Sequence, residues 1–414
     1  MATLTALMPV KVQELKWREQ SLGEIDFPKE RLRLAAGFGS GLATRPAAPG
    51  AEVWAISDRG PNLKIEDAVE LYGWEAPKDW LDVKGAKLMP RPDVGPTIAL
   101  LKITDTTVEV RRTVRITDSN GKPVSGLPVP ESGHAECEPV LDLDGNHQRP
   151  VPSGMDTEGI ALLDDGSFWV GEEYGPSLVK LSAAGEVELR LIPEGMELPN
   201  AGYPVRDSLP ALAAKRHLNR GFEAIAVTPS NECLYLVFQS PLAHPSRNEH
   251  EKARHVRLWR LDADGNVVDQ YAYRLDDPDS FRRDGEKKRV KPSDLKVCEI
   301  FALDETRLLV LERASETSKV YRVDIAPELA IAPEHLQLDT RPTLEELSCR
   351  GAALAELPKH LLFTSDDSPE VCADIEGMAL IDDRSLLIVS DNDFGCEGKQ
   401  TRFYRLTFDE PLIG

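Results

Sequence analysis

Acidic residues recur at one position of a repeated sequence pattern, and their chemistry suits cation binding or acid–base catalysis. Five copies of a short apolar run occur, and four of them are led by a glutamate, namely Glu158, Glu223, Glu299 or Glu376, whereas Ser40 leads the earliest. Carboxylates brought close together repel one another unless protons or a cation neutralise them. A hard cation such as Ca²⁺, which takes about six to eight oxygen ligands, is one solution. The pattern therefore predicts a divalent-cation site, provided that the fold brings these positions together.

Other charged residues accompany the same repeats. Carboxylates stand at the end of the strand that follows the leading apolar run, at Asp58, Glu173 and Asp391. Arginines adjoin the acidic or Gly-Phe motifs, at Arg59, Arg220 and Arg313. Arginine binds phosphate oxygens through paired hydrogen bonds, and a metal ion offsets charge that develops in a transition state. The combination is typical of a site for an anionic oxygen substrate such as a phosphate ester.

Each of these residues also has a structural alternative. A glutamate before a glycine can cap a turn by accepting a hydrogen bond from a backbone N–H. An arginine beside a carboxylate can form an ion pair and take no part in ligand binding. The surplus of acidic residues can serve only to keep the surface soluble. The sequence leaves these alternatives open.

Hairpins are the elements that must position the charged residues. In residues 155–176, two apolar runs (160–163 and 168–171) flank an Asp-Asp-Gly turn. Asp-Gly between two β-prone runs is a strong hairpin signal, because the tight turn needs positive φ angles. Similar hairpins begin near residues 40, 223, 299 and 376, and each is usually followed by a further pair of strands. The unit therefore has about four strands.

Four-stranded units repeated along a chain predict an all-β fold, the β-propeller, whose ring closure removes exposed sheet edges. The five hairpins and the strand pair at residues 97–116 predict six blades, with the first and last strands sharing one blade. We expect a single domain over residues 1–414, repeats over about 35–408, long loops between blades and little helix. A solenoid or a sandwich is the alternative, although the repeated acidic position disfavours a sandwich.

The composition of the chain limits the kinds of molecule that it can bind. The 414-residue chain has a net charge of −21, which disfavours nucleic acid and anionic lipid as ligands. No apolar stretch is long enough to span a membrane. The first residues are apolar and Lys11, Lys16 and Arg18 follow, the reverse of a secretory signal. As written the chain is expected in the cytoplasm, or in the periplasm or outside the cell if a leader precedes it. The six cysteines lack zinc-site spacing, and Cys298 is expected in the core.

Several motifs in fixed order resemble a known family. They are GFGSGLA and SDRGPN, DTEGIALLDDGSFWVGEEYGPSL, NRGFEAIAV and QSPL, LLVLER, and DIEGMALIDD and VSDNDFG, spread over roughly residues 35–408. The chain resembles the bacterial and plant family known as esterase-like activity of phytase. The resemblance implies a phosphomonoesterase or phosphodiesterase role for Asp58, Glu158, Glu173, Glu223, Glu376 and Asp391. Ala224 after Glu223 departs from the pattern, and many relatives look secreted, which leaves the compartment and the substrate open.

The function predicted from these observations is metal-dependent hydrolysis of a small anionic molecule, a phosphate ester. The candidate catalytic residues are Glu158, Glu173, Glu223 and Glu376. The candidate substrate-binding residues are Arg59, Arg220 and Arg313. The candidate ligands of Ca²⁺, or of another divalent cation, are Asp58, Glu158, Glu223, Glu299, Glu376 and Asp391. A lactonase or other ester hydrolase, or a binding propeller with a structural metal, are the alternatives; the sequence predicts no oligomeric state.

Overall fold

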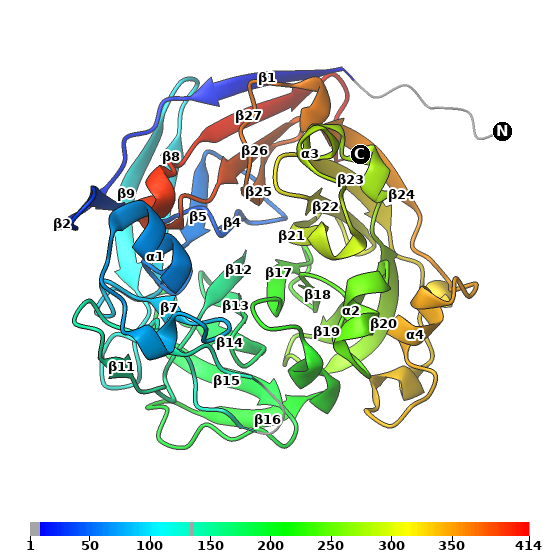
Figure 1. Ribbon diagram of the computed structural model, residues 1–414. Helices are drawn as coiled ribbons and strands as arrows, with labels where there is room; N and C mark the ends of the chain where they lie inside the picture. The colour runs from blue at the N-terminus through cyan, green and yellow to red at the C-terminus, as the bar shows by residue number, and fades with distance from the viewer. Residues whose placement is uncertain (1–8, 133–135, 414) are drawn as a thin grey trace.

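Five sheets stand around a central channel in the computed structural model, which describes residues 9–132 and 136–413 (Figure 1). From the channel outward, the first blade contains β4 (Gly41–Ala43), β5 (Glu52–Ile56), β8 (Thr97–Ile103) and β9 (Val108–Arg115). The second contains β12 (Thr157–Leu162), β13 (Phe168–Glu172), β14 (Ser177–Leu181), β15 (Val187–Pro193) and a parallel fifth strand, β16 (Val205–Leu209).

The remaining blades each have four antiparallel strands. The third contains β17 (Phe222–Val227), β18 (Cys233–Phe238), β19 (His255–Asp262) and β20 (Val267–Arg274). The fourth contains β21 (Lys296–Ala302), β22 (Arg307–Arg313), β23 (Ser318–Asp324) and β24 (Lys359–Thr364). The fifth contains β25 (Ile375–Asp382), β26 (Ser385–Ser390), β27 (Phe403–Phe408) and β1 (Val10–Leu15).

The sheets close into a ring, which confirms the predicted β-propeller. The inner strands contact one another in the order β4, β12, β17, β21 and β25, and β25 contacts β4 again. β1 pairs with β27 from Val10 opposite Phe408 to Leu15 opposite Phe403, so the two ends of the chain share a blade as predicted. Strands make up 40% of the chain and helices 14%, in agreement with an all-β fold that has little helix.

The predicted number of six blades is wrong, because the described residues form five. The strand pair at 97–116 does not start a blade of its own, since β8 pairs with β5 (Val53 opposite Leu101) and β9 pairs with β8. A long insertion separates β5 from β8 in the sequence. Because of this insertion, the sequence does not show that β5 and β8 belong to one sheet.

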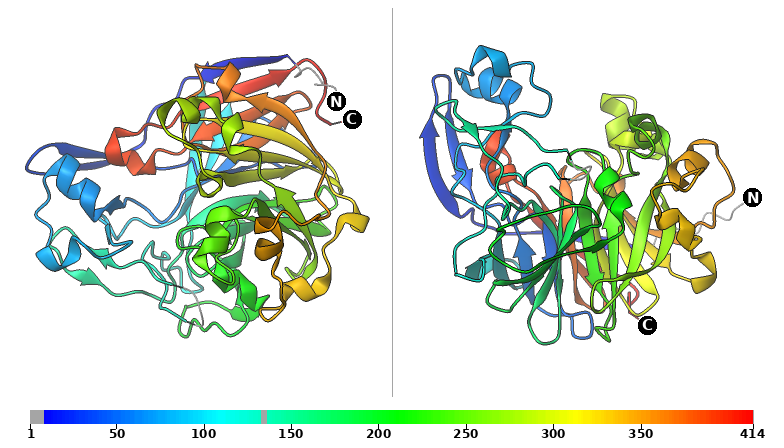
Figure 2. Two further views of the ribbon diagram at one scale, coloured as in Figure 1. Left: turned by 45° about the vertical axis from the view of Figure 1, so that its right-hand side comes forward. Right: turned by 90° about the horizontal axis from the view of Figure 1, so that it is seen from below.

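The insertions carry the helices and gather on one face of the propeller (Figure 2). A hairpin of β2 (Ser21–Asp26) and β3 (Arg31–Ala35) stands beside a small sheet of two-residue strands. That sheet comprises β6 (Leu63–Lys64), β7 (Lys87–Leu88), β10 (Val140–Leu141) and β11 (His147–Gln148). The α-helices are α1 (Ile65–Tyr72), α2 (Arg247–Lys252), α3 (Arg282–Lys287) and α4 (Leu344–Cys349). Within the described residues, no helix has the length and hydrophobicity needed to cross a bilayer.

The hydrophobic core lies between adjacent blades. Strands near the channel are covered on both faces, so β17 and β18 are almost continuously apolar. Trp259 of β19 packs edge-on against Phe238, with ring centroids 5.1 Å apart, and both rings contact Phe222. Large aromatic side chains contribute much of the apolar area that such a core removes from water.

Glycines allow the inner strands to approach closely around the narrow ring. A Cβ atom on Gly41 would lie 2.5 Å from the carbonyl oxygen of Glu158, and one on Gly159 would lie 2.7 Å from that of Glu223. Both atoms are backbone and cannot move aside easily. The small residues at these positions therefore set the diameter of the channel.

We expect Gly41→Ala to destabilise the protein by about 1–3 kcal/mol, the usual cost of overpacking a tight site. The measurement is the free energy of unfolding in urea. Gly50→Ala is the matched control, because a Cβ atom there meets nothing within 4 Å. Equal stability of the two variants would contradict the close packing of β4 against β12.

Candidate functional site

One end of the channel opens into a cavity of about 210 Å³ whose lining side chains are all polar or charged. It is lined by Asp58, Arg59, Asn62, Lys87, Glu158, Glu173, Asn219, Glu223, Gln239, Lys296, Arg313, Asp374, Glu376, Asp391, Asp393 and Lys399. We call it the acidic cavity. Most of the residues predicted as site candidates are therefore brought together, although their sequence positions span most of the chain.

β-bulges aim the repeated glutamates into this cavity. The pairing of an inner strand with its neighbour shifts just where Glu158, Glu223 and Glu376 occur. A bulge leaves its extra residue out of the ladder and re-aims the side chain. The repeated position found in the sequence is therefore a repeated backbone irregularity, and three of the predicted glutamates occupy it.

The fourth blade differs, and Glu299 does not line the cavity as predicted. Its bulge lies between Val297 and Glu299, so that Cys298 occupies the place of the other glutamates. The buried Glu299 carboxylate instead accepts hydrogen bonds from the backbone N–H groups of Leu42, at 2.9 Å, and Ile300, at 3.1 Å. A shift of one residue sends a strand side chain to the opposite side. Glu299 therefore has the structural role that was the alternative for each glutamate.

The same shift changes the charge at the end of the next strand. Glu173 and Asp391 follow their second strands and line the cavity, but in the fourth blade Arg313 does so. The preceding Glu312 accepts a hydrogen bond from Tyr273 at 2.7 Å and pairs with Lys359 at 2.9 Å, away from the cavity. The fourth blade thus supplies a cation where the other blades supply carboxylates or an amide.

Two groups of possible metal ligands lie in or beside the cavity. The first is Asp156, Glu158 and Glu173, each with a carboxylate oxygen within 4.8 Å of the others. Burial raises the pKa of all three, and neighbouring carboxylates add to the effect on Glu158. Burial also raises the pKa of Asp58 to about 7, although Arg59 opposes it. Burial and mutual repulsion therefore disfavour the ionised form of these carboxylates, and a bound cation would favour it.

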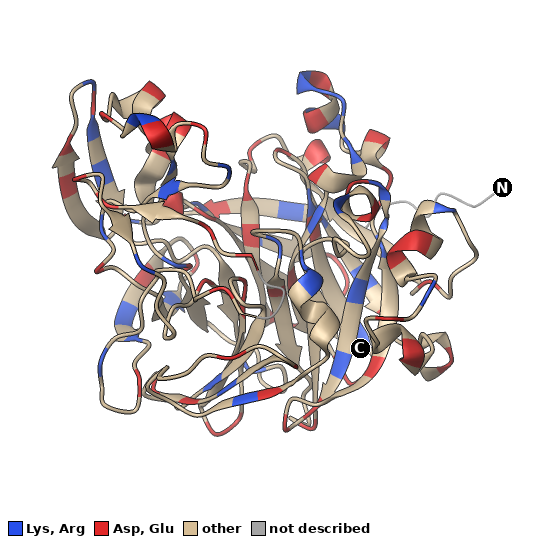
Figure 3. Cartoon of the chain, turned by 60° about the horizontal axis from the view of Figure 1, so that its bottom comes forward, with Lys and Arg blue, Asp and Glu red and all other residues tan. Residues whose placement is uncertain are grey.

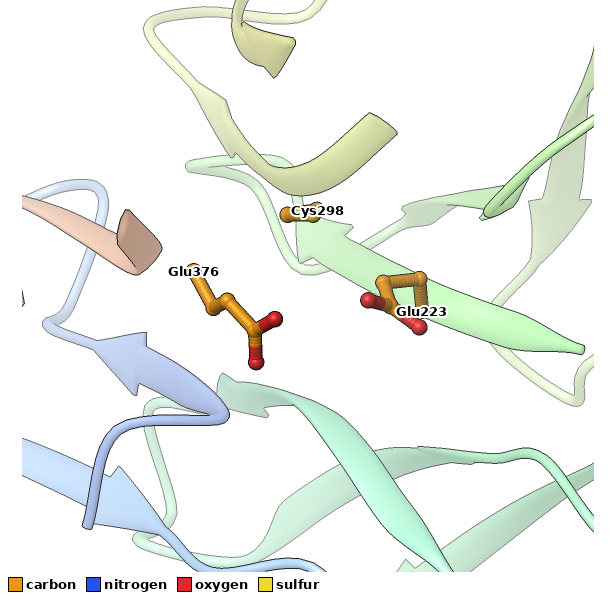
Figure 4. A group of neighbouring side chains, drawn as sticks. All are labelled: Glu223, Cys298 and Glu376. Carbon is orange, nitrogen blue, oxygen red and sulfur yellow. The ribbon is translucent and has the colours of Figure 1, made fainter. Parts of the chain in front are cut away.

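The second group, Glu223, Cys298 and Glu376, comes from three different inner strands (Figure 4). Burial raises the pKa of Glu223 to about 8, with further contributions from Glu173 and Glu376. One oxygen of Glu223 is buried and has no hydrogen-bond partner. The thiol of Cys298 accepts a hydrogen bond from Arg313 Nε at 3.2 Å, and burial raises its pKa. The thiol is therefore held neutral beside a guanidinium group.

Cations gather on the side of the third and fourth blades. Arg313 pairs with Asp374 at 2.9 Å and with Glu376. Arg220 does not line the cavity itself, but one of its guanidinium nitrogens is buried without a hydrogen-bond partner. Burial lowers the pKa of Arg220, and the negative charges of Glu173 and Glu223 oppose this. Burial lowers the pKa of Lys296, and Arg313 and Arg220 lower it further, which places the three cations close together. The unpaired donor of Arg220 suits an anionic ligand.

Arg59, like Arg313, already has ion-pair partners inside the protein. It pairs with Asp156 at 2.6 Å and with Glu138, donates to Asn219, and lies 4.9 Å from the centre of the Tyr174 ring. Its charge is therefore already used inside the protein, although its Nε atom is buried without a hydrogen-bond partner. The geometry favours the structural alternative for Arg59.

The backbone around the cavity is strained. Asn219, Asp374 and Asp393 all line it and have φ angles of 58°, 55° and 44°. Left-handed conformations are uncommon outside glycine and concentrate at functional sites, although Asn and Asp tolerate them best. The carboxylate of Asp393 accepts a hydrogen bond from Lys399 Nζ at 2.5 Å.

Sequence reasoning missed several lining residues. Asp393 and Lys399 stand in a loop outside the repeat, so no periodic signal marks them. Lys296 and Cys298 were hidden because the fourth repeat was aligned on the glutamate. Aligning the apolar residues Ile300 and Met378 instead would have placed Cys298 opposite Glu376.

The chain resembles a curated fungal protein and several solved structures. It is 26% identical over 266 residues to an uncharacterized secreted protein of Arthroderma benhamiae, with 56% of this chain and 49% of that protein covered. The chain thus spans about half the length of that relative. YCF48 bound to a D1 peptide is 8% identical with a TM-score of 0.33, over 99% of this chain and 100% of that one. The PQQ-bound aldose sugar dehydrogenase of Streptomyces coelicolor is 11% identical with a TM-score of 0.32, over 97% and 99%.

The fold is assigned from the five sheets, and the family is assigned from a match to a family profile. A family profile described as esterase-like activity of phytase matches residues 35–394, which include all five inner strands and every predicted site residue. The chain therefore belongs to the phytase-like family.

Proposed function

We propose that this protein is a metal-dependent hydrolase of phosphate esters, with Ca²⁺ or another divalent cation as cofactor. One observation carries the proposal: one polar cavity is lined by carboxylates of the first, second, third and fifth blades and, in the fourth blade, by the cations Lys296 and Arg313. A cation held by carboxylates and the protein's own cations together suit a phosphoryl group, because its oxygens are negatively charged. Negative charge also develops on the leaving-group oxygen during the reaction. We also propose that propeller and insertions work as one domain.

The donor atoms fit a hard divalent cation at Asp156, Glu158 and Glu173. All are carboxylate oxygens, which Ca²⁺ prefers, whereas the second group includes a thiol that accepts a hydrogen bond from Arg313. Asp58 and Asp391 are additional oxygen donors in the same cavity. When bound, such a cation lowers the pKa of a coordinated water and offsets negative charge.

The protein's own residues have separable roles in this proposal. Glu223 is the general base that takes a proton from the attacking water, because its buried oxygen has no partner and its pKa is raised to about 8. Lys296 and Arg313 hold the phosphoryl oxygens, and Arg220, which does not line the cavity, adds positive charge beside them. Glu376 keeps Arg313 in place through their ion pair. Glu158 and Glu173 bind the cation and orient the water.

The raised pKa values predict how stability depends on pH when no metal is bound. Asp58 and Glu223 have ordinary pKa values near 4, and the folded values are about 7 and 8. The folded state therefore binds more protons than the unfolded chain, and stability is lost as pH rises from about 4 to 8. We expect the melting temperature of the EDTA-treated protein to fall by several degrees over this window. Ca²⁺ should restore it at pH 8 and have little effect at pH 5.

The proposed function is tested by metal analysis and hydrolysis assays. The purified protein is analysed for bound elements and then assayed with 4-nitrophenyl phosphate, a phosphodiester and a lactone, each with and without Ca²⁺. Phosphate-ester turnover that EDTA abolishes and Ca²⁺ restores would support the proposal. Turnover of the lactone alone would favour the second candidate, an ester hydrolase, which the family's description as esterase-like also suggests.

Bound metal with no turnover of any substrate would indicate a binding propeller with a structural ion. The compartment is a separate proposal. The fungal relative is described as secreted, so we propose an extracytoplasmic location as the alternative to the cytoplasm. Fractionation of the natural host would distinguish the two.

A further inference from the structure

A second and larger cavity, of about 780 Å³, adjoins the acidic cavity. Lys87 and Asn219 line both, so the two cavities meet at these residues. One wall of the larger cavity is the insertion at residues 64–66 and 81–87, and the other is the propeller segment at residues 214–219. We call it the side groove. A molecule whose reacting group lies in the acidic cavity has room to continue into it.

The side groove is cationic, although the protein as a whole is strongly acidic. Its lining contains six Lys or Arg residues and four Asp or Glu residues, in a chain of net charge −21. Elsewhere both signs are spread over the helices and loops of the surface (Figure 3). Among these residues, Glu138 is already paired with Arg59, and Arg247 is already paired with Glu251, which leaves more cations than carboxylates. An excess of positive charge therefore faces the groove.

Lysines of the groove are free to bind a ligand. Among the described residues, the side chains of Lys84, Lys87 and Lys215 form no hydrogen bond or ion pair, although burial lowers the pKa of Lys87 and the charge of Glu138 opposes this. Lys84 is exposed on the insertion, Lys215 lies on the opposite wall, and Lys87 stands at the junction with the acidic cavity. Cations on both walls and at the inner end can contact one anionic molecule at more than one point.

Apolar side chains stand among these cations. Leu81 is 43% exposed and Val83 36% exposed, and they are two of the four most exposed large hydrophobic residues of the described chain. Leu218 lines the opposite wall. Exposed apolar side chains that border a pocket are typical of ligand contacts. The groove thus combines an apolar surface with uncompensated positive charge.

We propose that the side groove binds the leaving group of the substrate, and that this group is an organic chain or ring carrying a second anionic group. The inference rests on the proposed hydrolase function and names the class of its substrate. The ester to be cleaved lies in the acidic cavity. The apolar part lies against Leu81 and Val83, and the second anionic group is held by Lys84 and Lys215. The groove is a specificity-determining subsite and takes no part in bond cleavage.

A matched pair of substrates tests the subsite. Hexyl phosphate and hexanediol bisphosphate share the same chain and the same scissile group, and only the second carries a distal phosphate. We expect kcat/KM to be about tenfold higher for the bisphosphate, the effect of one or two well-placed cations. In the double variant Lys84→Gln/Lys215→Gln the ratio should fall below about twofold. Lys102→Gln, an exposed lysine of β8 outside the groove, should keep the ratio of the parent protein.

The outcomes separate this inference from the proposed function. A ratio that stays high in the double variant, or that is near one in the parent protein, would overturn the subsite. If neither ester is hydrolysed, the proposed hydrolase function fails instead, and calorimetric binding of the same two esters then tests the groove. Tighter binding of the bisphosphate that the double variant loses would support the groove, and equal affinities would exclude it.

Discussion

Glu223→Gln is expected to lower kcat on a phosphate ester by about 10²–10⁴-fold, the usual contribution of a positioned general base. Glutamine keeps the size of the side chain but cannot accept the proton of an attacking water. KM should change little, because the phosphoryl oxygens are assigned to Lys296 and Arg313. The measurement is steady-state kinetics at saturating Ca²⁺, so that weakened metal binding does not imitate the loss of the base.

Stability gives this variant a second readout. Without metal, Glu223 lies close to Glu173 and Glu376, which raise its pKa by repulsion. A neutral amide relieves that repulsion, so the metal-free variant should melt at the same temperature as the parent protein or above it at pH 8. Glu188→Gln, on an exposed position of β15, is the matched control and should leave kcat unchanged. A loss of kcat smaller than about tenfold would exclude Glu223 as the base.

Arg59→Met is expected to destabilise the protein by about 3–5 kcal/mol, the cost of leaving buried carboxylates without their partner. Asp156 and Glu138 both lose their ion pair with Arg59, and the side chains of all three are at most 5% exposed. A residue that only contacted substrate would instead change KM and leave stability unaffected. The measurement is the free energy of unfolding, determined with and without Ca²⁺.

Two further variants test whether the loss of stability in Arg59→Met comes from the buried ion pairs. Arg31→Met removes an exposed pair with Glu24, at 52% and 44% side-chain exposure, and should change stability by at most about 1 kcal/mol. Adding Asp156→Asn to Arg59→Met removes one of the stranded charges and should recover part of the loss. An Arg59→Met variant as stable as the parent protein, with a raised KM, would reinstate Arg59 as a substrate ligand.

Local sequence was sufficient to predict the class of fold and most of the site. Each hairpin is encoded by neighbouring residues: a turn such as Asp164–Gly166 between two apolar runs needs no distant information. Since the repeats place Glu158, Glu223 and Glu376 at one position of one unit, closure of the ring is enough to bring them together. For the same reason, the pairing of the first strand with the last could be predicted from the ends of the chain.

Other features depend on contacts between segments far apart in the sequence. The blade count was missed because β5 and β8 are separated by the insertion that also forms one wall of the side groove. Glu299 was misplaced because the bulge in β21 falls one residue earlier than the glutamate, and a bulge is set by the pairing of two strands. Nothing in the residues around Arg59 indicates that Glu138 and Asn219 would take up its donors.

The repeated hairpins, the propeller class and the convergence of three glutamates on one channel were thus determined by the sequence itself, because they follow from local periodicity and symmetry. The tertiary structure alone decided which carboxylates face the cavity, that Cys298 and Arg313 replace acidic residues in the fourth blade, and that a cationic groove adjoins the acidic cavity. These features depend on strand register and on how an insertion lies across the propeller face. Register is a relation between two strands, and no single stretch of sequence contains it.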